Sequence, residues 1–83
     1  MVKDDDIIKI LVNVLENEEL LNYSMNQEIN MDSLQFVRLV VDLEEFYNIE
    51  FPDSLLIQKK MNSIKKIKQS VSEIIRIYNS DLI

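Results

Sequence analysis

Carboxylates, lysines, hydroxyls and tyrosines are the side chains through which this chain could do chemistry. Its 83 residues include no His, no Cys and no Gly. The chain therefore lacks the commonest general base and metal ligand, any thiolate or disulfide, and the glycines of phosphate-binding loops. Its acids show no paired spacing that suggests acid–base catalysis, so we expect no catalytic residue and no metal site. The composition disfavours an enzyme and favours a binding or carrying role.

Ser33 is the hydroxyl with the most definite setting. Asp32 precedes it, where the N-cap of a helix is expected, and Leu34 begins an apolar periodic segment after it. Ser33 should therefore lie in the first turn of a helix with its hydroxyl pointing outward. As a catalytic nucleophile it would need a base, and the sequence offers none.

The elements that must position Ser33 follow from apolar spacing with a period of 3.6 residues. This pattern predicts helices over about residues 5–16 and 33–47, a short helix over 54–60, and a last helix to about residue 78, capped by Ser63. A long loop over residues 17–31 joins the first two. We expect an all-α fold, a small bundle of three main helices plus one short helix, forming a single domain over residues 1–83.

The predicted helix over residues 33–47 is apolar on two sides. The side expected to face the core carries Phe36, Leu39, Val40, Leu43 and Tyr47. A second stripe carries Leu34, Val37 and Val41, and Glu44 and Glu45 lie beside it. Because so short a chain cannot easily bury a helix all round, we expect this stripe to face solvent and a partner. The alternatives are that the stripe is core and that the two glutamates are merely solvated charges.

Charge is unevenly distributed in this acidic chain. The net charge is −6, and residues 1–53 hold 13 acids and 3 bases, whereas residues 54–83 hold 2 acids and 6 bases. The two halves either steer a basic partner or compensate one another in the fold. An acidic surface disfavours nucleic-acid binding. No apolar run approaches the roughly 20 residues of a membrane span, and the acidic N-terminus lacks the basic start of a signal peptide, so we expect a cytoplasmic protein.

Three motifs lie between Asp32 and Asp53: Asp32-Ser33-Leu34, Leu43-Glu44-Glu45 and Phe51-Pro52-Asp53, at intervals that need no gaps against the pattern described next. In these motifs the chain resembles the acyl carrier protein family and the related peptidyl carrier domains, over about residues 7–75. The resemblance implies that Ser33 is esterified with 4′-phosphopantetheine from coenzyme A. The thiol of that arm would hold acyl or aminoacyl groups as thioesters. Asp32 would cap the turn and Leu34 would adjoin the arm, whose phosphate would face the positive end of the helix dipole, an attraction of ~0.3–1 kcal/mol.

The resemblance also implies partners. These are a phosphopantetheinyl transferase (carrier protein synthase) and acyl-transferring, condensing or adenylating enzymes of fatty-acid, polyketide or nonribosomal-peptide synthesis, served by a non-catalytic monomer. The expected contact residues lie along the second helix: Leu34, Val37, Arg38, Val41, Glu44 and Glu45. Gln35 and Arg38 occupy positions that are often acidic in fatty-acid carriers, so a carrier specialised for another pathway is an equal expectation. The alternative is a non-modified helical interaction module that docks through the Leu34, Val37 and Val41 stripe and does not need Ser33.

Overall fold

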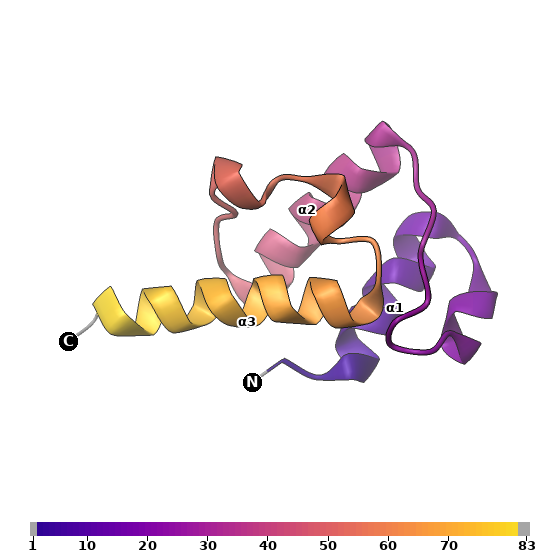
Figure 1. Cartoon of the computed structure of the whole chain (residues 1–83), viewed down its shortest axis with the longest axis horizontal. Helices are drawn as coiled ribbons and strands as arrows, with labels where there is room; N and C mark the ends of the chain where they lie inside the picture. The colour runs from indigo at the N-terminus through magenta and orange to yellow at the C-terminus, as the bar shows by residue number, and fades with distance from the viewer. Residues whose placement is uncertain (1, 82–83) are drawn as a thin grey trace.

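Three α-helices form the protein in the computed structural model, which describes residues 2–81, with side chains described through residue 78. They are α1 (Asp4–Leu15), α2 (Ser33–Tyr47) and α3 (Ile64–Asp81). Three short 3-10 turns lie between them: η1 (Glu18–Asn22), η2 (Asp53–Leu55) and η3 (Gln58–Lys60). No strand occurs within residues 2–81, so the all-α class expected from the sequence is confirmed (Figure 1).

Helix α1 begins without a side-chain cap. Lys3 occupies the N-cap position in an extended conformation, and Asp4, Asp5 and Asp6 fill the first turn. The three acids therefore favour the helix start through their interaction with the helix dipole and not as an N-cap. Asp4 also binds α3, since the Lys68 Nζ lies 2.8 Å from its Oδ1.

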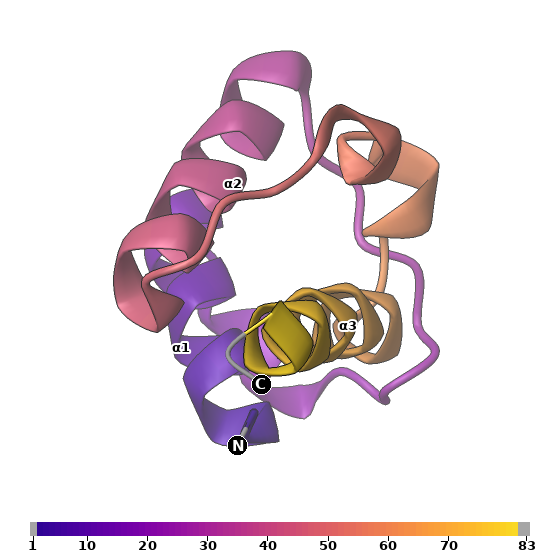
Figure 2. The same cartoon turned by 90° about the vertical axis from the view of Figure 1, so that its left-hand side faces the viewer.

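The core lies where α1 packs against both α2 and α3 (Figure 2). Its side chains come from all three helices and from the segments that flank and join them. Each such apolar side chain contributes roughly 1.5–3 kcal/mol when it leaves water. Those with 0% exposure are Ile7, Leu11, Leu39, Leu43, Met61, Ile64, Ile67 and Val71.

The short helix predicted over residues 54–60 is wrong. The chain forms η2 and η3 there, and Ile57 between them is extended, with φ −120° and ψ 118°. Leu56 and Ile57 remain 39% and 44% exposed. A helix this short needs a buried apolar face for stability, and of the apolar side chains over residues 54–60 only Leu55 packs partly against the core. Over residues 2–81 the bundle therefore has three helices and not four.

Helix α3 begins as predicted and extends beyond its predicted end. The Ser63 Oγ accepts a hydrogen bond from the Lys66 N–H at 3.2 Å, as expected of an N-cap. The helix continues past Tyr78, whose hydroxyl accepts from the Glu50 N–H at 2.7 Å and donates to the Glu50 carbonyl at 3.5 Å. Tyr78 thus anchors the segment that follows α2 to the second half of α3.

Within the described residues, none of the helices combines the length and the apolar character needed to cross a membrane.

Candidate functional site

The turn that presents Ser33 is fixed by two reciprocal hydrogen bonds. The Asp32 Oδ1 accepts from the Gln35 N–H at 2.8 Å, and the Gln35 Oε1 accepts from the Asp32 N–H at 3.0 Å. This capping box satisfies two backbone donors that the start of a helix otherwise leaves free. The structure has Asp32 as the N-cap, as the sequence indicates. The matching role of Gln35 was missed, although Gln at the third helical position is its usual signal.

Ser33 is the first residue of α2, and it is exposed. Among the described residues, none forms a hydrogen bond with its hydroxyl, and the first turn of α2 contains no acid. The adjacent backbone N–H groups and the positive end of the helix dipole favour an anion at this position. An exposed hydroxyl in such a turn fits the attachment of a phosphate ester.

Two hydrogen bonds hold the chain that leads into Ser33. The Gln58 Nε2 of η3 donates to the Met31 carbonyl, and the Ile29 N–H donates to the Asn62 carbonyl at 2.7 Å. Residues 29–31 are thereby tied to residues 58–62. The sequence pattern could not show this link, because the partners are about 30 residues apart and belong to no periodic face.

The second apolar stripe of α2 faces solvent, as expected. Leu34, Val37 and Val41 are 71%, 55% and 43% exposed. Arg38 and Glu45 on the same helix are also exposed. These five side chains lie on α2, which begins at Ser33, and an exposed apolar stripe beside charged side chains suits contact with another protein.

Glu44 differs from its neighbour Glu45. It is only partly exposed, and its Oε2 accepts a hydrogen bond from the Phe51 N–H at 2.9 Å. One oxygen of the carboxylate therefore holds the segment after α2. The other oxygen remains for a contact with another molecule. Its sequence position gave no sign of this internal bond.

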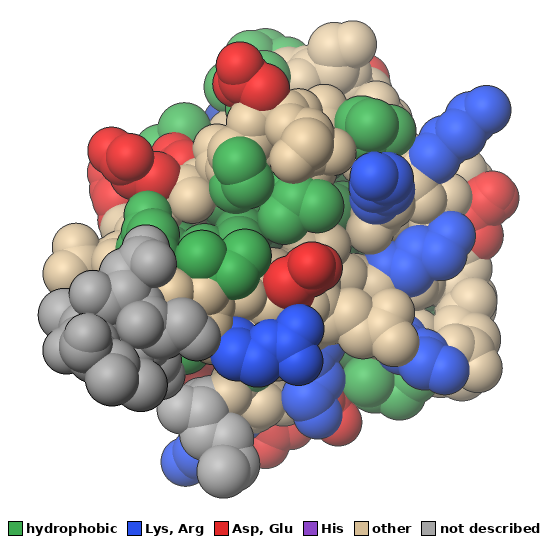
Figure 3. Space-filling model, turned by 60° about the vertical axis from the view of Figure 1, so that its left-hand side comes forward, with side chains coloured by type: hydrophobic (Ala, Val, Ile, Leu, Met, Phe, Trp, Pro, Cys, Tyr) green, Lys and Arg blue, Asp and Glu red, His purple; other side chains and the backbone are tan. Residues whose placement is uncertain are grey.

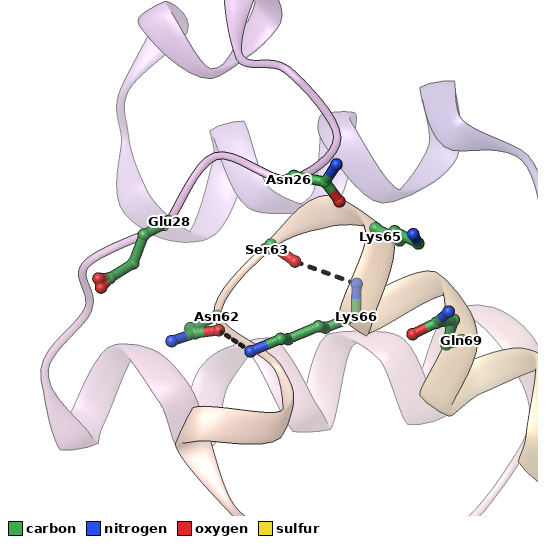
Figure 4. A pocket seen from close by; sticks show the side chains of 7 residues that line it. All are labelled: Asn26, Glu28, Asn62, Ser63, Lys65, Lys66 and Gln69. Carbon is green, nitrogen blue, oxygen red and sulfur yellow. Dashed lines mark hydrogen bonds between the residues drawn. The ribbon is translucent and has the colours of Figure 1, made fainter.

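The first turns of α3 border a polar hollow next to the loop over residues 26–28. Figure 4 shows Lys66 between Asn62 and Ser63, and the Lys66 Nζ donates to the Asn62 Oδ1 at 3.1 Å.

Lys and Arg side chains spread over one side of the molecule, in keeping with the basic last third of the sequence (Figure 3). Within the described residues no cluster of acids could hold a metal ion.

Comparison with known proteins gives two matches. Residues 5–71 match the model of a family described as the phosphopantetheine attachment site. An aminoacyl carrier protein of Agrobacterium fabrum is 42% identical over 45 residues, which are 54% of either chain. The chain thus spans about half the length of this curated relative. No solved structure matches the chain at a significant level.

Proposed function

The chain belongs to the phosphopantetheine-attachment family of carrier proteins, and we propose that Ser33 is the residue that bears its arm. Members of this family carry a 4′-phosphopantetheine group and generally catalyse no reaction themselves. When bound, the group supplies a thiol that forms thioesters, and this chain contains no thiol of its own. The role of the protein is therefore to hold the arm in place and to present it.

The observation that carries the proposal is the free, exposed hydroxyl at the start of α2. Ser63 provides the contrast, because it also lies at the start of a helix. Ser63 is only 4% exposed, and its Oγ is occupied by the Lys66 N–H. Ser33 alone of this pair can be reached by an enzyme, and its capping box fixes the turn from which it projects.

Attachment requires one bond to form and one to break. The Ser33 Oγ would bond to the phosphorus that carries pantetheine in coenzyme A, and the bond from that phosphorus to adenosine 3′,5′-bisphosphate would break. The hydroxyl proton must pass to a base. The sequence contains no His, the commonest general base, and we assign this role to a phosphopantetheinyl transferase, of which the chain would be the substrate.

We further propose that the loaded arm carries acyl or aminoacyl groups to partner enzymes of fatty-acid, polyketide or nonribosomal-peptide synthesis. Leu34, Val37 and Val41 supply apolar contact for these enzymes, while Arg38 and Glu45 give orientation and a faster encounter. The relative named as an aminoacyl carrier supports an aminoacyl cargo. The chain would act as one domain over residues 1–83, as a monomer in the cytoplasm.

The test is the intact mass of the protein after incubation with coenzyme A and a broad-specificity phosphopantetheinyl transferase. We expect the wild type and the control Ser54→Ala to gain one arm, and Ser33→Ala to gain none while keeping its helicity. A gain in Ser33→Ala would refute the site. If the wild type gained nothing while a known carrier was modified in parallel, the unmodified interaction module with the same α2 stripe would be favoured instead.

A further inference from the structure

A hollow of about 410 Å³, lined by both polar and apolar side chains, lies beside the chain that leads into Ser33. One wall is formed by residues 28–31 and the other by η3 and Asn62; we refer to the hollow and its two walls as the seam. The residues that line it are Glu28, Ile29, Asn30, Met31, Gln58, Lys59 and Asn62. The seam is thus joined directly to the turn where the arm would be attached.

Two hydrogen bonds cross the seam at increasing distance along the chain from Ser33. Gln58 bonds to Met31, two residues before Ser33, and Asn62 bonds to Ile29, a further two residues before Met31. Glu28, the residue before Ile29 in the chain, lies at the end of the seam that is farther from Ser33. It also borders the hollow of Figure 4. An arm laid along the seam from Ser33 would pass the amide side chains first and reach Glu28 with its end.

The chemistry of the seam matches that of pantetheine, which contains two amide groups and carries a phosphate at one end. Asn30, Gln58 and Asn62 offer amide groups for hydrogen bonds, and the ammonium of Lys59 suits the phosphate. Glu28 is exposed, and its carboxylate has no ion-pair partner among the described residues. The end of the seam therefore presents an unpaired negative charge.

That charge distinguishes two classes of cargo. An aminoacyl thioester has a free ammonium, whereas a simple acyl thioester has none. An ammonium would be strongly disfavoured in the core, where Met61, Ile64 and Ile67 are fully buried and apolar. It must therefore stay at the surface, and Glu28 offers it an opposite charge there.

The geometry points to a docking site for the loaded arm along the seam, where Glu28 favours a cationic aminoacyl cargo over a neutral acyl group. This inference rests on the proposed function. The site deepens that function by assigning a cargo class. It requires no contact with a partner enzyme.

The test compares glycyl and propionyl arms, which have similar shapes but end in an ammonium and a methyl group. Each is attached to Ser33 by the transferase, and backbone amide shifts are measured by NMR. We expect the glycyl arm to perturb residues 28–31 and 58–62 more than the propionyl arm does. Glu28→Gln should remove this difference, whereas the control Glu19→Gln in η1, outside the seam, should keep it.

A second measurement is the rate at which hydroxylamine cleaves the thioester. Glu28→Gln should speed cleavage of the glycyl thioester by about two- to fivefold, the range expected for an exposed ion pair, and leave the propionyl thioester unchanged. High salt should have the same effect on the wild type.

The outcomes separate this proposal from the one on which it rests. If the mass shows an arm on Ser33 but the amide shifts lie outside the seam, or Glu28→Gln affects both cargoes equally, the docking site is refuted and the carrier role stands. If no variant gains an arm, the carrier role itself fails.

Discussion

The two faces of α2 carry the same kinds of side chain in opposite surroundings. On the inner face Leu39, Val40 and Leu43 are 0%, 8% and 0% exposed. On the outer face Leu34, Val37 and Val41 are 71%, 55% and 43% exposed. Apolar character alone therefore does not determine the role of a residue in this helix. The inner face stabilises the fold, while the outer face adds little to stability and remains available for another protein.

Truncation of the inner face should have the largest effect. Leu39→Ala should lower the free energy of unfolding by about 2–5 kcal/mol, because it leaves a cavity in a fully packed core. The measurement is urea denaturation followed by circular dichroism. Leu34→Ala on the outer face is the matched control and should change the stability by less than about 0.5 kcal/mol. Equal losses in the two variants would contradict the distinction between the faces.

Removal of the cap that both faces share should have an intermediate effect. Asp32→Ala should reduce stability by about 0.5–2 kcal/mol, because it leaves the Gln35 N–H without its acceptor. Asp32→Asn retains an acceptor oxygen and should lose less. Both variants can be compared by thermal unfolding. An Asp32→Ala protein as stable as the wild type would show that the capping box does not hold the Ser33 turn.

A charge on the outer face should affect recognition and spare the fold. Val41→Asp should leave helicity unchanged and slow attachment of the arm by about fivefold, the effect of losing roughly 1 kcal/mol of contact with the transferase. The rate is followed by intact mass over time. Ser72→Asp on an exposed part of α3 is the control and should react at the wild-type rate. If Val41→Asp unfolded the protein, the outer stripe would belong to the core.

The smallest effect is expected at Tyr47, at the end of α2. Its hydroxyl is buried and has no hydrogen-bond partner among the described residues, so Tyr47→Phe should be neutral or slightly stabilising near pH 7. Burial, with a smaller contribution from the charge of Asp6, raises the pKa of Tyr47 above its usual 10.0. The unfolded chain therefore ionises first as the pH rises.

The stability of the wild type should therefore depend on pH differently from that of Tyr47→Phe. The contribution of Tyr47 to stability is present below about pH 10 and is lost as the pH rises through its folded-state pKa. The wild type should thus lose more stability than Tyr47→Phe as the pH rises from about 9 to about 11, measured by urea denaturation at each pH. Parallel curves for the two proteins would contradict this account.

The limits of α2 could be predicted from the sequence because each has a local signal. Asp32 caps the start, and Asn48 ends the helix in the left-handed region with φ 54°. The apolar period between them identified the buried face. For α3 the cap at Ser63 was equally visible, but its end was not, because Tyr78 is held by a hydrogen bond to Glu50 that no local pattern shows.

The rest of the fold and site depends on contacts between distant residues. The sequence predicts neither η1 within the long loop nor the division of residues 54–60 into η2 and η3, since the exposure of Leu56 and Ile57 depends on packing. The bonds from Gln58 to Met31 and from Phe51 to Glu44 join polar groups that follow no period. The proposal for Ser33 rests on its sequence motif, whereas the seam beside it could emerge only from the structure.

Two helix ends bend through the left-handed region without a glycine. Glu16 has φ 52° and Asn48 has φ 54°, in a chain where every residue has a Cβ atom. A Glu in this region costs about 1–2 kcal/mol of local strain, more than an Asn. A chain without glycine, however, has fewer conformations to lose when it folds. Part of the stability of this small protein therefore comes from the restricted freedom of its unfolded state and not from any contact in the folded one.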